Sequence, residues 1–147
     1  MRKARANLVL AAIALLALAG CGDGSGEESR SDFVREGNAI CRDAKTDIRR
    51  AISRRMVDPR ELAARAYLER VARETLIPRL ERQLRQLRGL PIPPGDEGSL
   101  RELLGALEAA LERSQRKPFT FGPAKNSPYA KPDRLARAYG LTDCVSG

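Results

Sequence analysis

Apolar residues in this chain recur at intervals of three and four, the spacing that places side chains on one face of an α-helix. The first such stripe contains Phe33, Gly37, Ile40, Cys41, Ala44, Ile48 and Ile52. Ser31 or Asp32 is a candidate N-cap, and we expect the helix to end near Met56. The spacing predicts that Cys41 lies on the side of this helix that faces the core.

A second stripe begins at Asp58-Pro59-Arg60-Glu61, a pattern typical of a helix start, with Asp as N-cap and Glu placed to bond the cap amide. Its further members are Leu68, Val71, Thr75, Leu76, Leu80, Leu84 and Leu87. Gly89 is a candidate left-handed terminator. Pro78 removes one backbone donor inside the stripe, so we expect either a kink or a break near Ile77.

Three prolines and a glycine in residues 90–95 predict a stiff connector that cannot be helical. We expect Asp96 to cap a third helix that ends at Lys117-Pro118. Its apolar residues are Leu100, Leu103, Leu104, Leu107, Ala110 and Leu111. A short fourth helix is expected to open at Pro132-Asp133, with Gly140-Leu141 supplying a left-handed cap and the hydrophobic contact that follows it.

The combined pattern predicts an all-α fold: a small antiparallel helical bundle of three long helices plus a short C-terminal helix. No segment shows the alternation of a β-strand. The 147 residues include no histidine, which excludes Ser-His-Asp and Cys-His catalysis and imidazole zinc sites. The three cysteines are too few for a zinc site made of thiolates alone. We therefore assign no catalytic residue, no metal ligand and no cofactor.

The N-terminus has the pattern of an export signal. Arg2, Lys3 and Arg5 precede an apolar run of 12 residues, whereas a membrane-spanning helix needs about 20. The next segment, Leu18-Ala19-Gly20-Cys21, resembles the lipobox of bacterial lipoproteins. This resemblance implies a lipid on the Cys21 sulfur and cleavage just before it; the alternative is an ordinary secretory signal cut after Ala19. The domains expected are a signal peptide at 1–20, a flexible tether at 21–31 and a helical domain at 32–147.

If Cys21 carries lipid, Cys41 and Cys144 are left with one intramolecular pairing, and an oxidising compartment favours it. We predict a Cys41–Cys144 disulfide; the alternative is two buried thiols. The chain is also similar to small lipoproteins of unknown function from high-GC Gram-positive bacteria. They share a lipobox, helices around a Leu-Pro-Pro-type connector and a closing Gly-Leu-x-x-Cys, here Gly140 to Cys144. This resemblance supports the disulfide and implies no activity.

Without residues 1–20 the chain keeps 24 basic and 19 acidic residues. One candidate anion-binding site is a series of arginines three residues apart, because guanidinium groups bind phosphate in a bidentate manner. The series is Arg79, Arg82, Arg85 and Arg88. The alternative is an ordinary solvated helical face. Candidate partners are anionic lipid, a wall polymer or an envelope protein, and an exported domain is not expected to bind nucleic acid.

A second candidate site is the loop expected at 118–132, where Phe119, Phe121 and Tyr129 lie near Lys125. Aromatic faces beside hydrogen-bond donors can bind a polar ligand. Alternatively, the two phenylalanines fill the open end of the bundle.

A third candidate is the carboxylate pair Glu108 and Glu112, which are four residues apart. A hydrolase needs two carboxylates with separated pKa values in a cleft. On an amphipathic helix that also carries Arg101, Arg113 and Arg116, such a pair is more typical of the solvated face.

The function expected from the sequence is that of a lipid-anchored protein on the extracytoplasmic face of the cell membrane. It would act as a non-enzymatic helical interaction module in the cell envelope. The alternative is a binding protein for a small polar or polymeric ligand through residues 118–132, and a hydrolase is a distant alternative. A concave pocket would favour ligand binding, whereas a flat, convex bundle would favour interaction with a partner.

Overall fold

The computed structural model describes residues 24–54, 65–118 and 127–146. Its elements are α1 (Gly24–Ser53), α2 (Arg65–Val71), the π-helical turn η1 (Ala72–Leu76), α3 (Ile77–Arg88), α4 (Glu97–Arg116), α5 (Ala130–Tyr139) and the 3-10 turn η3 (Thr142–Cys144). No strand occurs within these described ranges. The predicted all-α class is therefore confirmed.

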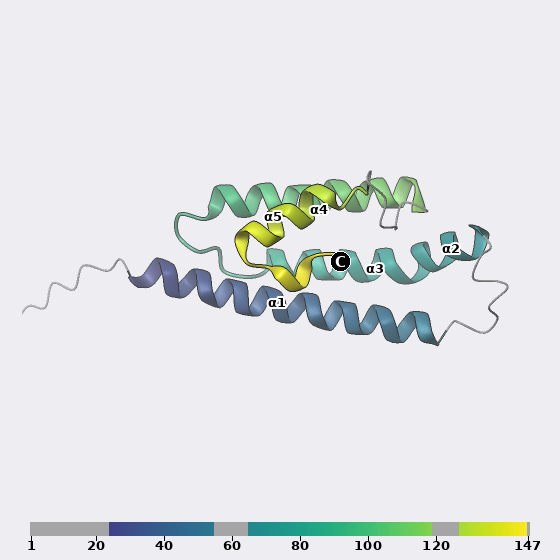
Figure 1. The fold of residues 1–147 in the computed structure, drawn as a ribbon, viewed down its shortest axis with the longest axis horizontal. Helices are drawn as coiled ribbons and strands as arrows, with labels where there is room; N and C mark the ends of the chain where they lie inside the picture. The colour runs from purple at the N-terminus through teal and green to yellow at the C-terminus, as the bar shows by residue number, and fades with distance from the viewer. Residues whose placement is uncertain (1–23, 55–64, 119–126, 147) are drawn as a thin grey trace, which may run out of the picture.

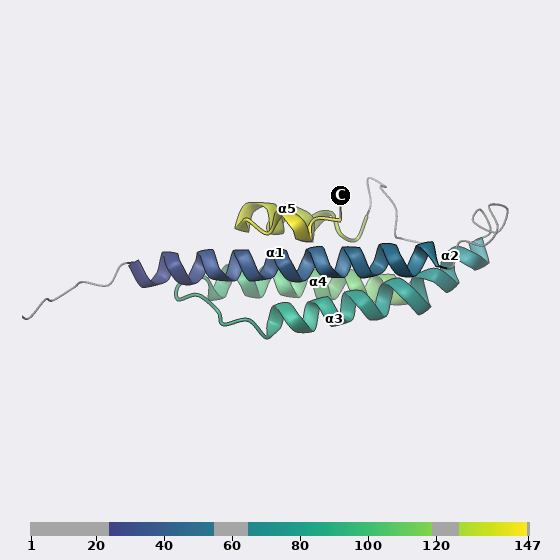
Figure 2. The same cartoon turned by 90° about the horizontal axis from the view of Figure 1, so that it is seen from below.

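The helices form a bundle. α1, α3 and α4 lie side by side and run in alternating directions (Figure 1). The second view shows α3 and α5 on opposite sides of the layer that α1 and α4 form (Figure 2). Because α5 packs on α4 while η3 packs on α1, the C-terminal segment closes one face of the bundle.

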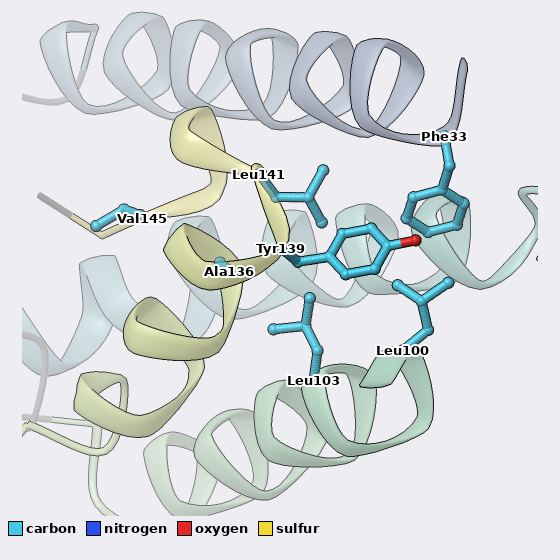
Figure 3. Packing of buried hydrophobic residues seen from close by; sticks show 7 residues of the cluster. All are labelled: Phe33, Leu100, Leu103, Ala136, Tyr139, Leu141 and Val145. Atoms are coloured by element: carbon cyan, nitrogen blue, oxygen red, sulfur yellow. The ribbon is translucent and has the colours of Figure 1, made fainter. Parts of the chain in front are cut away.

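The largest buried cluster joins α5 to α1 and α4 (Figure 3). Phe33 of α1 meets the Tyr139 ring edge to face, with 5.7 Å between the ring centroids and 83° between the planes. Leu100 of α4 is fully buried beside them. The cluster is completed by Leu103, Ala136, Leu141 and Val145. A second, smaller cluster joins α3 to α4.

The first helix starts earlier than predicted. α1 begins at Gly24, so residues 24–31 of the expected tether are helical and neither Ser31 nor Asp32 is its N-cap. The Arg30 guanidinium lies 4.7 Å from the centroid of the Tyr139 ring and 3.6 Å from the Asp96 carboxylate. These contacts stabilise the extra turns, and the sequence periodicity does not show them. The helix ends at Ser53, and Met56 lies outside the described residues.

The middle helix bends at the proline and does not break. Leu76 and Ile77 both keep right-handed helical backbone angles, and the Ile77 N–H donates to the Ala72 carbonyl five residues earlier. The wider turn makes room before Pro78, whose ring would otherwise meet the preceding carbonyl. The uninterrupted second long helix is thus not confirmed, and Leu68 is exposed. The predicted start at residues 58–61 lies outside the described residues.

Gly89 is not the left-handed terminator that we predicted, because its φ is −80°. The chain leaves the helix instead at Leu90, which precedes Pro91 and is therefore restricted to extended conformations. The positive φ of the connector belongs to Gly95, at +88°. Asp96 N–H donates to the Pro93 carbonyl across Pro94 and Gly95, the hydrogen bond of a tight turn that needs glycine at its third position.

Asp96 stands at the N-cap of α4, but its side chain makes no capping hydrogen bond, so this part of the prediction is wrong. Its φ of −99° and ψ of 2° lie outside the extended region that capping requires. The Tyr139 hydroxyl donates to the Asp96 carboxylate at 2.6 Å instead. Burial, then this hydrogen bond, raises the pKa of Tyr139 above its ordinary value. The carboxylate therefore joins α4 to α5.

α5 begins at Ala130, two residues before the predicted start at Pro132, because the Asp133 N–H donates to the Tyr129 carbonyl. Its end is as predicted. Gly140 has a φ of +99°, and Leu141 N–H donates back to the Ala136 carbonyl at 2.8 Å. This is the Schellman pattern of hydrogen bonds. It turns the chain so that Leu141 enters the core.

The predicted Cys41–Cys144 disulfide is confirmed and joins α1 to η3, with 5.0 Å between the Cα atoms. Asn38, one turn earlier on α1, binds the same segment through both ends of its amide. Its Nδ2 donates to the Gly140 carbonyl at 3.0 Å, and its Oδ1 accepts from the Asp143 N–H at 2.9 Å. The covalent bond and these hydrogen bonds fix the C-terminus on α1.

Two glycine-to-alanine changes in helix interiors are expected to have opposite effects. A Cβ at Gly37 would lie 2.6 Å from Leu141 Cδ2 in the core, so Gly37→Ala should destabilise by about 1 kcal/mol, as overpacking outweighs helix propensity. Gly105 is exposed with nothing within 4 Å, so Gly105→Ala should stabilise by about 0.5–1 kcal/mol. Urea unfolding measures both free energies, and equal signs would contradict the packing described.

Candidate functional site

A cavity of about 860 Å³ lies between α1, α3, α4 and the C-terminal segment. Its interior is largely aliphatic, because the apolar stripes of the three helices converge there. The aliphatic residues are Ile48 of α1, Leu76 and Leu80, Leu84 and Leu87 from the middle helix, and Leu107 and Leu111 of α4. The volume falls within the range of about 300–1,000 Å³ that is typical of ligand sites.

Polar side chains line the rest of the cavity. Lys45 and Arg49 are one turn apart on α1, and Arg137 comes from α5. All three are exposed. They make no ion pair within the part of the chain that the structure describes. The described lining thus combines an apolar interior with three cations that form no ion pair with a described carboxylate.

Among the described residues that line the cavity, Asp133 is the single acidic one, and each of its oxygens accepts a hydrogen bond from Ser146. Oδ1 accepts from the Ser146 N–H at 3.0 Å, and Oδ2 accepts from the Ser146 hydroxyl at 2.5 Å. Asp47, which lies between the two cations of α1 in the sequence, pairs with Arg79 at 3.0 Å and with Arg82 at 3.7 Å. The electrostatic character of the described cavity wall is therefore basic.

Tyr129 is the one predicted ligand residue whose position is described, and it lines the cavity at the start of α5. Its side chain is 8% exposed, and its hydroxyl hydrogen-bonds with that of Ser114 at 3.2 Å. Burial raises the pKa of the Tyr129 hydroxyl above its ordinary value, so the group is neutral at physiological pH. Phe119, Phe121 and Lys125 lie outside the described residues.

The structure does not bring the four arginines of α3 into one site. Each residue of an α-helix is rotated by about 100° from the one before it. The nine positions from Arg79 to Arg88 therefore make about two and a half turns, which places these two arginines on opposite faces. Arg79 pairs with Asp47 of α1, whereas Arg88 forms a bidentate pair with Glu108 of α4 at 2.7 and 3.2 Å. Arg82 joins the first of these pairs, and Arg85 is exposed and lines no part of the cavity.

Glu108 and Glu112 do not lie in the cavity either. Both are exposed; Glu108 pairs with Arg88, and Glu112 pairs with Arg116 at 3.7 Å. The hydrogen bond from Arg88 lowers the pKa of Glu108, which is the opposite of what a general acid needs. Within the described ranges, no group of three or more metal-binding side chains is present.

Lys45 and Arg137 were not predicted as site residues, and Arg49 was expected only as part of a general basic surface. Lys45 and Arg49 flank Ile48, so a pair of bases beside an apolar position of α1 was the available signal. Arg137 had none, because its place depends on how α5 docks against the bundle.

Comparison of the chain with family models, with curated proteins and with solved structures finds no match. Among the described residues, none belongs to a helix with the length and hydropathy needed to cross a membrane.

Proposed function

We propose that this protein is a lipoprotein anchored through Cys21 on the extracytoplasmic face of the cell membrane, and that its helical domain is a non-enzymatic binding module for a small, partly apolar ligand. The single observation that carries the binding function is the cavity between α1, α3 and α4. Its concave shape favours a small ligand over the interaction module that we first expected, for which a convex surface is typical. The anchor rests on the lipobox resemblance.

We interpret α2, η1 and α3 as one bent helical member, which makes three long members together with α1 and α4. Leu141 belongs to the buried cluster around Phe33 and Tyr139, which joins α5 to α1 and α4. The cavity lies beside η3, whose Cys144 lines it together with side chains of α3.

The proposed site differs from the loop that we considered from the sequence. Tyr129 belongs to both, because it is one of the residues that line the cavity. Ser127 and Ala130 of the same segment also line the cavity, and most of the other lining side chains come from the helices. A largely aliphatic lining favours a ligand with a substantial apolar part, whereas a purely polar ligand would leave most of that lining in contact with water.

The proposal predicts saturable binding of a neutral apolar probe. The chain from residue 22 onward, which keeps every described residue, is titrated with the fluorophore N-phenylnaphthylamine. We expect one site per chain and a rise in fluorescence as the probe leaves water. Ala130→Trp, at an exposed position of the cavity wall, should fill the cavity and weaken binding about tenfold, which corresponds to about 1.4 kcal/mol.

The matched control is Ala138→Trp, because Ala138 is exposed on the same helix and does not line the cavity. This variant should bind the probe like the unmodified chain. Absence of saturable binding, or an equal loss in both tryptophan variants, would refute the proposed function. Helical circular dichroism verifies that each variant is folded.

A further inference from the structure

The three cations that line the cavity are Lys45, Arg49 and Arg137, and none of them forms an ion pair with a described residue. Arg42 of α1 and Arg79, Arg82 and Arg88 of α3 do form ion pairs, whereas Arg50 and Arg134, which do not line the cavity, form none with a described residue. The three cavity cations come from two helices that are distant in sequence and meet at one cavity. A ligand with negative charge would neutralise them.

We propose that the ligand is a single-chain phosphate monoester, whose phosphate binds to Lys45, Arg49 and Arg137 while its apolar chain lies among the leucines of the cavity. This inference rests on the proposed binding function and names its ligand class. The three cations are exposed, so the phosphate lies at the opening. The apolar chain points inward, against Leu80, Leu84 and Leu111.

A phosphate monoester fits this set of cations better than a carboxylate does. It carries a charge of about −1.5 to −2 at neutral pH and has three strong acceptor oxygens, whereas a carboxylate carries a single charge. Two of the three cations are arginines, whose planar guanidinium groups can each donate two parallel hydrogen bonds to phosphate. Asp133 keeps its negative charge, because its hydrogen bonds come from the neutral N–H and hydroxyl of Ser146; three cations and one carboxylate thus leave the described lining with a net charge of +2.

The cavity is large enough for one aliphatic chain. Its volume of about 860 Å³ lies in the upper part of the range found for drug-sized ligands. A phosphate with one aliphatic chain is a ligand of this size class.

The test compares three twelve-carbon compounds that differ only in their polar group: dodecyl phosphate, dodecanoate and dodecanol. Each competes with N-phenylnaphthylamine for the chain from residue 22 onward. We expect dodecyl phosphate to bind about tenfold more tightly than dodecanol, with dodecanoate between them. The advantage of the phosphate should shrink as salt is added, because exposed cations are screened, while dodecanol binding stays constant.

Charge-neutralising variants locate the phosphate. Arg49→Gln and Arg137→Gln should each weaken dodecyl phosphate binding about fivefold and leave dodecanol binding unchanged. The matched controls are Arg50→Gln on α1 and Arg134→Gln on α5, two exposed arginines that do not line the cavity. Neither control should alter the binding of either compound.

The outcomes separate this inference from the proposed function. Equal binding of dodecyl phosphate and dodecanol, or an equal effect of the controls, overturns the phosphate assignment while the binding function stands. Dodecanoate binding as tightly as dodecyl phosphate also overturns it. If the fluorophore binds only after Phe119→Ser and Phe121→Ser are introduced together, the chain's own residues occupy the cavity, and both proposals fail.

Discussion

Replacement of both Cys41 and Cys144 by alanine is expected to lower the free energy of unfolding by about 4–5 kcal/mol. The disulfide joins positions that are 103 residues apart, and closing a loop of this length restricts the unfolded chain strongly in the chain-entropy model. A loss of this size is a large part of the 5–15 kcal/mol that stabilises a typical domain. Because Cys41 is 1% exposed, alanine also leaves a small void in the core.

Urea unfolding followed by circular dichroism measures the effect. The control is the unmodified chain in reductant, which has the native side chains but no crosslink and should lose nearly the same stability. A change below about 1 kcal/mol in the reduced chain would show that Asn38 and the core alone hold the C-terminal segment in place. The chain-entropy model would then overestimate the contribution of this disulfide to the free energy of unfolding.

Cys21→Ser is expected to release the protein from the membrane. Serine has no thiol to receive a diacylglyceryl group, and each methylene that the lipid buries in the bilayer contributes about 0.8 kcal/mol to anchoring. Two acyl chains hold a protein stably, whereas none leaves only the weak attraction of the basic surface to anionic lipid. We therefore expect a change from a membrane-bound to a released protein when cell fractions are washed at high salt.

Incorporation of a labelled fatty acid provides the second measurement, and the Cys21→Ser variant should show none. The matched control is the Cys41→Ala and Cys144→Ala variant, which loses two cysteines, keeps Cys21 and should remain labelled and membrane-bound. A Cys21→Ser protein that stays in the washed membrane fraction would indicate that the apolar run at 8–19 is retained as an anchor. Such retention agrees with a lipobox whose cleavage follows lipid transfer, whereas incorporation of the labelled fatty acid by the Cys21→Ser variant would contradict the lipobox interpretation.

Local features of the fold were predictable because their causes lie within a few residues. The spacing of three and four located the helices, since each apolar stripe has to be buried somewhere. Gly140 was identifiable as a left-handed cap because glycine adopts a positive φ without steric cost and a hydrophobic residue follows it. The disulfide was predictable once Cys21 was set aside, because only one pairing was left.

The errors arose where a distant contact changed a local preference. Aspartate is a residue type that is favoured at N-caps, but the Asp96 carboxylate binds Tyr139 and Arg30 instead. Asp96 and Tyr139 both contact Arg30 and so hold the first turns of α1, in a segment whose small and acidic residues suggested a tether. Gly89 was assigned from its residue type alone, while the proline at position 91 ends the helix through its steric effect on Leu90.

The sequence by itself determined the helices, the left-handed turn after α5 and the crosslink between α1 and the C-terminus, because helix periodicity, glycine geometry and cysteine number act locally or leave one choice. Only the tertiary structure decided where the candidate site lies. Lys45, Tyr129 and Arg137 are distant in the chain, and they line one cavity because α5 packs on α4 while η3 packs on α1. Side-chain contacts between helices depend on the relative positions of those helices, and a single helical stripe does not encode them.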